Sequence, residues 1–359
     1  MTGTYTEREI RRQPELWHQT IALVKEKREW IREQFLDASP EEILFTGCGT
    51  SYYLSIAAAA IFAEKTGFPA KAVPASDLYL KPTSVLSPRR RTWVIGSSRS
   101  GNTTELVRAL QTAERQFAVP CLGVTGNPES ELARQTTTLL LPHIQEKSVV
   151  MTGSFTNLLL SLQIITAFIA EDERFLEELK HLADLGDQIL AKSEEWGRLL
   201  GEDRTRDRTV YLGLGANFGL ACEGMLKLKE MTQEVSEAFN PMEFRHGPIS
   251  ILDERWRVVL VSDRSLTSFE ETLVRELKET GAEICAIGDG VATLGADRPL
   301  DLSSGLSDAA RAALTVPALQ WMAFYRTYQM GLNPDRPRNL NPVVLLKDRG
   351  GKSNGPPID

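Results

Sequence analysis

Residues 41–51 read EEILFTGCGTS, an apolar run that ends in two glycines and two hydroxyl residues. Such a run is typical of a buried strand that ends in a tight turn. An alanine-rich segment of helical character follows over residues 51–67. Further strands are expected at AKAV (70–73), TWVIG (92–96) and CLGVT (121–125), with a helix over residues 103–116. This alternation of strands and helices predicts a parallel sheet with helices on both faces.

The same pattern returns later in the chain. Gly213, in VYLGLGANFG (210–219), follows Gly47 by 166 residues, and Arg264 follows Arg99 by 165. The simplest interpretation is two copies of one α/β unit. We expect an N-terminal helical segment over residues 1–36, the two units over residues 37–195 and 196–333, and an extended C-terminal tail over residues 334–359. Thr6 and Glu9 have the spacing of a capping box, which predicts that a helix opens there.

The composition is that of a soluble globular enzyme. The chain has 359 residues, a net charge of −7, 42% apolar and 25% charged residues. A negative net charge argues against a nucleic-acid partner. Apolar stretches such as LSIAAAAIFA (54–63) fall short of the roughly 18 residues that span a bilayer, and the N-terminus is polar. The four cysteines form no C-x-x-C pair, so we expect no disulfide framework, no metal site and a cytoplasmic protein.

One loop is far richer in hydroxyl groups than a strand end needs. SSRSGNTTE (97–105) follows an expected strand and opens an expected helix. Helix N-termini offer free N–H groups and a positive dipole end, where phosphate binds readily. Ser98, Ser100 and Thr103 would add hydroxyl donors. An ordinary helix cap is the alternative, but one cap needs only one hydroxyl, so we favour a phosphate site.

Other candidate residues are weaker when taken singly. In GCGTS, Thr50 and Ser51 are candidate sugar or phosphate contacts. A nicotinamide cofactor is excluded because Tyr52 stands where a third glycine is needed, and no other cofactor is expected. Glu146 lies in an expected loop before a helix start. Glu223, Lys227 and Glu230 share one helical face, where the usual meaning is a solvated ladder of ion pairs. His246, in FRHGP (244–248), is a loop histidine of a kind that is more often structural.

Taken together and in this order, six stretches resemble the double-SIS (sugar isomerase) family. They are GCGTSYY (47–53), SSRSGNTTE (97–105), SFTNLLL (154–160), EGMLKLKEMTQEVSEAF (223–239), FRHGP (244–248) and DRPRNL (335–340). The closest resemblance is to the isomerase half of glucosamine-6-phosphate synthase and to its stand-alone deaminase and deglycase relatives. It implies two tandem SIS domains, each a flavodoxin-like α/β/α sandwich.

The resemblance also implies roles for particular residues. Ser98, Ser100, Thr103 and the N–H of Arg99 would hold the sugar phosphate, and Thr50, Ser51 and Glu146 would lie by the sugar. Glu230 would be the general base that moves a proton between C1 and C2. His246 would open the sugar ring from the neighbouring subunit of a homodimer. A histidine suits this step because it gives and accepts protons near neutral pH.

Two departures from the synthase matter. The chain starts MTGTY rather than with a catalytic cysteine, so we expect no glutamine-derived ammonia. Asn341 and Pro342 stand where the synthase has a small residue and a Schiff-base lysine. Either Lys227 or Lys347 replaces that lysine, or the reaction does not need it.

Two kinds of function therefore remain open. The first is an enzyme, an amino-sugar-phosphate deaminase or isomerase, or a fructosamine-phosphate deglycase. The second is a phosphosugar sensor that has lost catalysis. We favour the enzyme because Glu230 and His246 are both present, and the chain has no helix-turn-helix segment.

Overall fold

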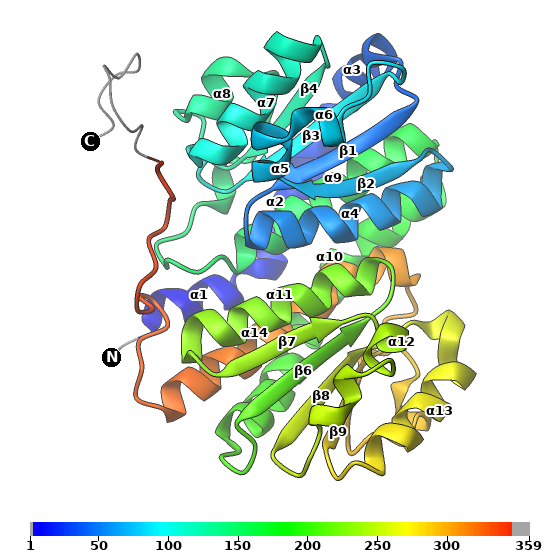
Figure 1. Ribbon diagram of the computed structural model, residues 1–359, viewed down its shortest axis with the longest axis vertical. Coiled ribbons are helices and arrows are strands. Elements are labelled where there is room, and N and C mark those ends of the chain that lie inside the picture. The colour runs from blue at the N-terminus through cyan, green and yellow to red at the C-terminus, as the bar shows by residue number, and fades with distance from the viewer. Residues whose placement is uncertain (1–2, 347–359) are drawn as a thin grey trace.

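The computed structural model describes residues 3–346 and contains two five-stranded sheets. The strand order is β2-β1-β3-β4-β5 in the first sheet and β7-β6-β8-β9-β10 in the second, and neighbouring strands run parallel. Both are the flavodoxin-like order 2-1-3-4-5. The predicted fold class is thus confirmed: two α/β units lie one above the other (Figure 1). The strands are β1 Glu42–Gly47, β2 Ala70–Pro74, β3 Thr92–Ser98, β4 Cys121–Thr125, β5 Thr138–Leu140, β6 Arg208–Gly213, β7 Val235–Phe239, β8 Trp256–Val261, β9 Glu283–Gly288 and β10 Arg298–Asp301.

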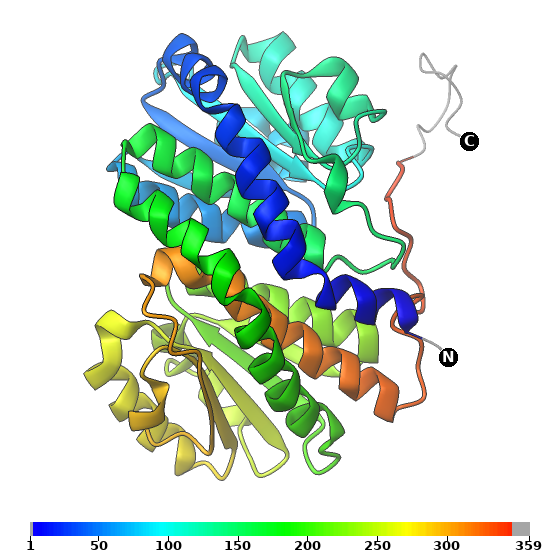
Figure 2. The same ribbon diagram turned by 180° about the vertical axis from the view of Figure 1, so that it is seen from behind.

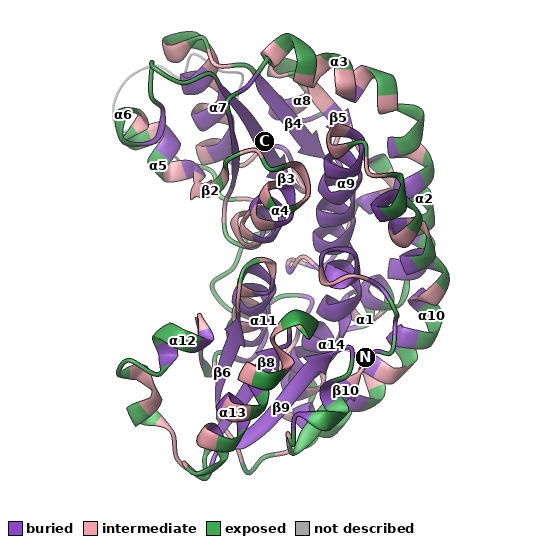
Figure 3. Ribbon diagram, turned by 90° about the vertical axis from the view of Figure 1, so that its right-hand side faces the viewer, coloured by how far each residue is buried: buried purple, intermediate pink, exposed green. Residues whose placement is uncertain are grey.

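Helices cover both faces of each sheet. Helix α9 is almost wholly buried and α14 is largely so, whereas outer helices such as α2 and α10 expose one face (Figure 3). The predicted boundary near residue 195 falls inside the long helix α10, which packs along α14. The helices are α1 Thr4–Arg11, α2 Gln13–Glu26, α3 Arg28–Ala38, α4 Thr50–Thr66, α5 Ala75–Leu80, α6 Pro82–Val85, α7 Thr104–Phe117, α8 Glu131–Gln135, α9 Gly153–Ala170, α10 Glu173–Glu202, α11 Ala216–Thr232, α12 Pro241–Phe244, α13 Thr267–Lys278 and α14 Asp308–Gln329.

Among the described residues, α9 is the one helix that is long and apolar enough to cross a membrane. Apolar runs in the sequence do not reveal it, because residues such as Asn157 and Gln163 interrupt them. Inside the protein 89% of this helix is buried. Its polar side chains bond to other buried groups, for example Gln163 Nε2 to the carbonyl of Ala309. These are the surroundings of a core helix.

The capping box predicted from Thr6 and Glu9 is wrong. Helix α1 begins at Thr4, and both side chains point inward. Thr6 donates its N–H and its hydroxyl to Asp335 Oδ1, at 2.8 and 2.7 Å. Glu9 accepts from the N–H of Lys147 at 2.6 Å. Thr6 and Glu9 therefore bond to residues that are distant in the sequence and do not cap the helix.

The two units meet where α4 of the first packs on α11 of the second. A glycine permits the close approach. A Cβ atom at Gly219 would lie 2.6 Å from the backbone N of Ala57 and from the carbonyl oxygen of Tyr53, so no larger residue fits without moving a helix. The result is that side chains of α11 reach the strand ends of the first unit.

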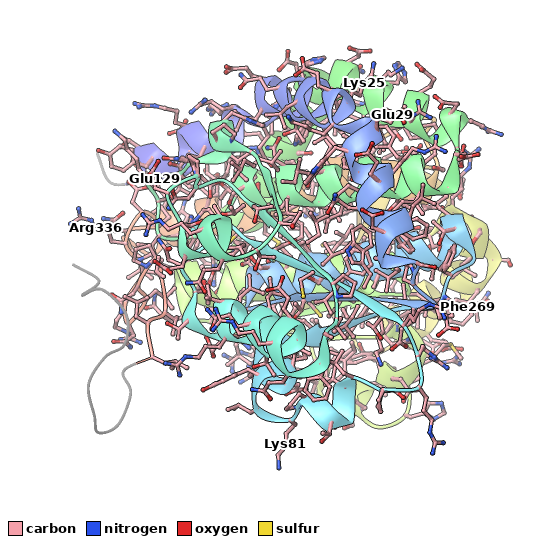
Figure 4. All side chains as sticks on the ribbon, turned by 90° about the horizontal axis from the view of Figure 1, so that it is seen from above. Lys25, Glu29, Lys81, Glu129, Phe269 and Arg336 are labelled. Atoms are coloured by element: carbon pink, nitrogen blue, oxygen red, sulfur yellow. The ribbon has the colours of Figure 1, made fainter. Side chains whose placement is uncertain are left out.

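The chain beyond α14 crosses back from the second unit to the first. It passes beside α1 and climbs along one side of the molecule (Figure 2). Asp335 fixes the crossing through its bonds to Thr6 and through its carbonyl, which accepts from the N–H of Val149 at 3.1 Å. Arg336 projects at the edge of the molecule (Figure 4). Farther along, Leu346 and Val344 lie against Thr104 at the start of α7.

Candidate active site

A cleft of about 200 Å³ lies at the carboxyl ends of β1 and β3. The chain order of the first sheet reverses between these two strands, which is where ligands bind in open α/β sheets. The cleft combines three parts of the chain: two strand ends of the first unit, α11 of the second and the tail. Its lining is Cys48, Gly49, Thr50, Ser51, Ser98, Arg99, Ser100, Thr103, Val149, Met151, Glu230, Leu340, Asn341, Pro342 and Val344.

The hydroxyl-rich loop forms one wall of the cleft. Ser98 Oγ accepts from the N–H of Gly101 at 3.0 Å and lies 3.5 Å from Thr103 Oγ1. Gly101 has φ +65°, and a Cβ there would lie 2.3 Å from Ser130 Oγ, so the turn requires glycine. Thr103 precedes α7 without a side-chain cap on the helix. The loop therefore brings hydroxyls and a helix N-terminus together, as an anion site requires.

Arg99 lines the cleft, but its guanidinium turns away from it. Nη1 donates to Glu146 Oε2 and to the carbonyl of Ser148, both at 3.1 Å, and Nη2 donates to the carbonyl of Val149 at 2.9 Å. The side chain thus ties the hydroxyl-rich loop to residues 146–150. The guanidinium is therefore engaged away from the cleft, and the resemblance assigns the backbone N–H of Arg99 to the phosphate.

Glu146 does not lie in the cleft. Its side chain is 2% exposed and sits behind Arg99. Besides Arg99 it accepts from the N–H and the hydroxyl of Thr152, at 3.0 and 2.9 Å, and from the N–H and the hydroxyl of Ser154. These groups open helix α9. Glu146 thus links Arg99 to the start of α9 from a buried position. The sequence placed Glu146 beside the sugar, but its side chain does not line the cleft.

A buried cluster from α11 forms the opposite wall. The Lys227 ammonium lies 2.5 Å from Glu230 Oε2, 3.4 Å from Glu223 Oε1 and 3.1 Å from Thr50 Oγ1. Lys227 and Glu223 are fully buried, and Glu230 is 19% exposed toward the cleft. The solvated ladder that this spacing usually means is therefore wrong here, because α4 covers the face.

Burial and charge shift the protonation of this cluster. Burial, and next the Glu230 charge, raise the pKa of Glu223 to about 8, although Lys227 opposes the shift. Burial disfavours the Lys227 ammonium, but Glu223 and Glu230 outweigh it and raise the lysine pKa. Shifted groups of this kind concentrate at functional sites. At neutral pH the lysine is charged and orients the Glu230 carboxylate at the cleft.

His246 is exposed after α12 and does not line the cleft. Its neighbours Met242 and Ile251 are also exposed, at 39% and 38%. The structure thus brings together Thr50, Ser51, Ser98, Arg99, Ser100, Thr103, Lys227 and Glu230, and leaves out Glu146 and His246. From the sequence, Glu223 was expected only in a solvated ladder, and the tail residues around Asn341 were not expected to line the cleft with the hydroxyl-rich loop. Lys347 lies outside the described residues.

Comparison with known proteins agrees with the fold. The SIS domain model matches residues 38–170 and 204–298, and the chain belongs to this family. It is 30% identical to a D-galactosamine-6-phosphate deaminase of Escherichia coli, over 94% of this chain and 92% of that protein. It is 31% identical to the glutamine–fructose-6-phosphate aminotransferase of Gloeobacter violaceus, over 87% of this chain. The chain spans only about half the length, 53%, of that relative.

A solved structure shows the same architecture over nearly the whole chain. The tagatose-6-phosphate ketose/aldose isomerase of E. coli superposes with a TM-score of 0.85 and 26% identity, covering 96% of this chain and 97% of that one. Within the SIS family, the chain therefore stands with the phosphosugar isomerase and deaminase enzymes.

Proposed function

We propose that this protein is an amino-sugar 6-phosphate deaminase of the isomerising type. It would take an amino-aldose 6-phosphate and water, and release a ketose 6-phosphate and ammonia. The observation that carries the proposal is the meeting of two kinds of group in one cleft. The hydroxyl-rich loop of the first unit faces Glu230 of the second, which Lys227 holds at 2.5 Å.

Phosphate would bind at the hydroxyl-rich loop and serve as the handle that positions the sugar. Ser98, Ser100 and Thr103 supply hydroxyls there, next to the N-terminus of α7. Binding energy from this remote group fixes the reacting carbons against the opposite wall. Thr50 and Ser51 lie between the two walls and would contact the sugar hydroxyls.

Glu230 would carry the proton between C1 and C2 of the open-chain sugar. The carboxylate removes the C2 proton while a proton passes from the substrate's ammonium group to O1, which leaves an enaminol with a double bond between C1 and C2. Returning the C2 proton to C1 gives an iminium at C2. Water then adds to C2, ammonia leaves, and the ketose phosphate remains. A positioned carboxylate is suited to such a shuttle, and Lys227 balances its charge before the first transfer and after the second.

This reaction explains why a lysine is not needed where Asn341 and Pro342 line the cleft. The iminium forms from the amine that the substrate already carries, so no Schiff base with the protein is required. The names of two relatives contain the substrate and the product of one such reaction, since deamination of galactosamine 6-phosphate yields tagatose 6-phosphate. We take galactosamine 6-phosphate as the first substrate to test.

The test is release of ammonia and of ketose phosphate from a panel of hexosamine 6-phosphates and fructosamine 6-phosphates. Both products from a hexosamine phosphate support the proposal. Turnover of fructosamine phosphates alone would favour the deglycase reaction, which the sequence left open. Binding of the whole panel without any turnover would favour the phosphosugar sensor.

Ring opening needs a second group, which His246 would supply across a homodimer. Its exposure, and that of Met242 and Ile251 beside it, support a surface that meets a second copy. Mixing a Glu230→Gln subunit with a His246→Ala subunit should restore up to one good site per heterodimer. If the mixture stays inactive after verified subunit exchange, His246 does not act in trans.

A further inference from the structure

Glu9 is a buried carboxylate on α1 that plays no part in the proposed chemistry. It is 8% exposed and lies outside the cleft. Its Oε1 accepts from the N–H groups of Lys147 and Ser148, at 2.6 and 3.3 Å. One turn away, Thr6 Oγ1 lies 2.9 Å from Ser148 Oγ. Helix α1 therefore holds the segment 147–148 by two side chains.

The same segment carries the acceptors that hold Arg99. The carbonyls of Ser148, Val149 and Val150 all accept from the Arg99 guanidinium, at 3.1, 2.9 and 3.3 Å. Residues 147–150 thus donate backbone N–H groups to Glu9 and accept hydrogen bonds from Arg99 through their backbone carbonyls. Arg99 in turn lies within the hydroxyl-rich loop, between Ser98 and Ser100. Glu9 and the loop are therefore two hydrogen-bonded steps apart.

Burying the Glu9 carboxylate beside Glu146 costs free energy of folding, which argues against a role in stability alone. Burial, and next the charge of Glu146, raise the pKa of Glu9 to about 7. Arg99, at 11% exposure, is the cation that faces both carboxylates. A buried carboxylate beside another is expensive to charge, and an apolar side chain would cost less. Costly ionisable groups are common near functional sites.

We propose that Glu9 is a positioning residue for the phosphate loop. By holding the amides of Lys147 and Ser148, it fixes the carbonyls that hold Arg99, and so fixes the backbone that meets the phosphate. The inference rests on the proposed phosphate site. It extends that site to a residue of the N-terminal helix, which is far in sequence from the loop that would bind the phosphate.

The test measures binding of inorganic phosphate by calorimetry to the full chain and to three variants. Glu9→Ala should weaken phosphate binding about tenfold, because both amides lose their acceptor and the carbonyls that hold Arg99 are no longer fixed. Glu9→Gln keeps the acceptor for both amides and should bind within about twofold of wild type. The control is Glu7→Ala on the same helix. Glu7 is 43% exposed and pairs with Arg11, so its loss should leave phosphate binding unchanged.

Turnover separates positioning from general loosening. Glu9→Ala should raise KM while kcat stays within about twofold, because Glu230 and Lys227 are untouched. Wild-type phosphate affinity in a folded Glu9→Ala variant would overturn the inference, as would an equal fall in kcat. If Glu9→Ala does not fold, Glu9→Asp takes its place: its carboxylate is one methylene too short to reach both amides, so affinity should again fall. No phosphate binding by the wild type would count against the proposed phosphate site itself, and this inference would fall with it.

Discussion

The loops after β3 and after β8 occupy equivalent places in the two units, yet only one is open to an anion. In the second unit, Glu270 Oε1 accepts from the N–H of Asp263 at 2.9 Å, and its other oxygen accepts from the hydroxyl of Ser262. Asp263 in turn accepts from the N–H and the hydroxyl of Ser265, at 2.8 and 2.6 Å. Two carboxylates of the chain thus occupy the donors that a phosphate would use.

The first unit differs at the matching positions. Ser98 replaces Asp263, which removes a negative charge from the loop. Glu105 corresponds to Glu270, but it lies by the Cys48 thiol, whose pKa is raised to about 12 by burial and then by that carboxylate. Ser97 Oγ, the counterpart of Ser262 Oγ, has no partner in the described part of the chain. The exchange of Ser98 for Asp263, the exchange of Gly101 for Leu266 and the orientation of the carboxylate therefore distinguish the first loop from the second.

The largest expected effect tests whether the second unit supplies the base, Glu230, while the first unit binds the phosphate. Glu230→Gln should lower kcat about 10²–10⁴-fold, because it removes the proposed base without changing size. Exchange of the substrate C2 hydrogen with deuterated solvent should stop as well. Glu271→Gln, an exposed change in the same unit, is the control. Retention of both turnover and exchange in Glu230→Gln would move the chemistry elsewhere.

The next effect compares the two loops directly. Ser100→Ala with Thr103→Ala should weaken binding of a sugar phosphate about tenfold for each lost charge-assisted bond. The matched pair in the second unit, Ser265→Ala with Ser268→Ala, should leave KM unchanged. Equal losses from both pairs would mean that the second loop also binds the ligand.

The smallest effect concerns the filled loop. Burial raises the pKa of Glu270 above its ordinary value of 4.5. A raised pKa means that the folded protein holds this proton more tightly than the unfolded chain. The contribution of Glu270 to stability is therefore most favourable below pH 4.5 and falls as pH rises through the folded pKa. Glu270→Gln should shift the unfolding free energy by less than about 1 kcal/mol near pH 5 and become relatively more stable toward pH 8, as followed by thermal unfolding. A Glu270→Gln variant that becomes less stable relative to wild type as pH rises would contradict this account.

The fold could be predicted because the chain repeats itself. A spacing of 165–166 residues relates glycine turns and loop residues in both units, and the strands follow apolar runs. The loop residues could be predicted for a similar reason, since Ser98, Ser100 and Thr103 follow a strand and open a helix. Local sequence decides such features, and the structure keeps them where local sequence placed them.

The remainder depends on which elements come to lie side by side, and local sequence does not carry that information. Glu146 follows a strand as a ligand residue would, but Arg99 and the start of α9 surround it. The ladder of Glu223, Lys227 and Glu230 is buried because α4 packs on α11. The small residues Gly219 and Ala221 on α11 were the available sign of a close neighbour. The tail reaches the cleft through the bonds of Asp335 to Thr6 and Val149, and the stretch DRPRNL (335–340) does not by itself reveal these partners.

The glycine between the units also bears on the history of the chain. Gly219 lies 166 residues after Tyr53, the residue whose carbonyl it faces, so the two are the same position in the two copies. Two identical first units would set tyrosine against tyrosine and hold these helices apart. The two copies are therefore no longer interchangeable at this contact. A larger side chain on α11 at this contact would require a smaller one on α4, or a movement of the helix.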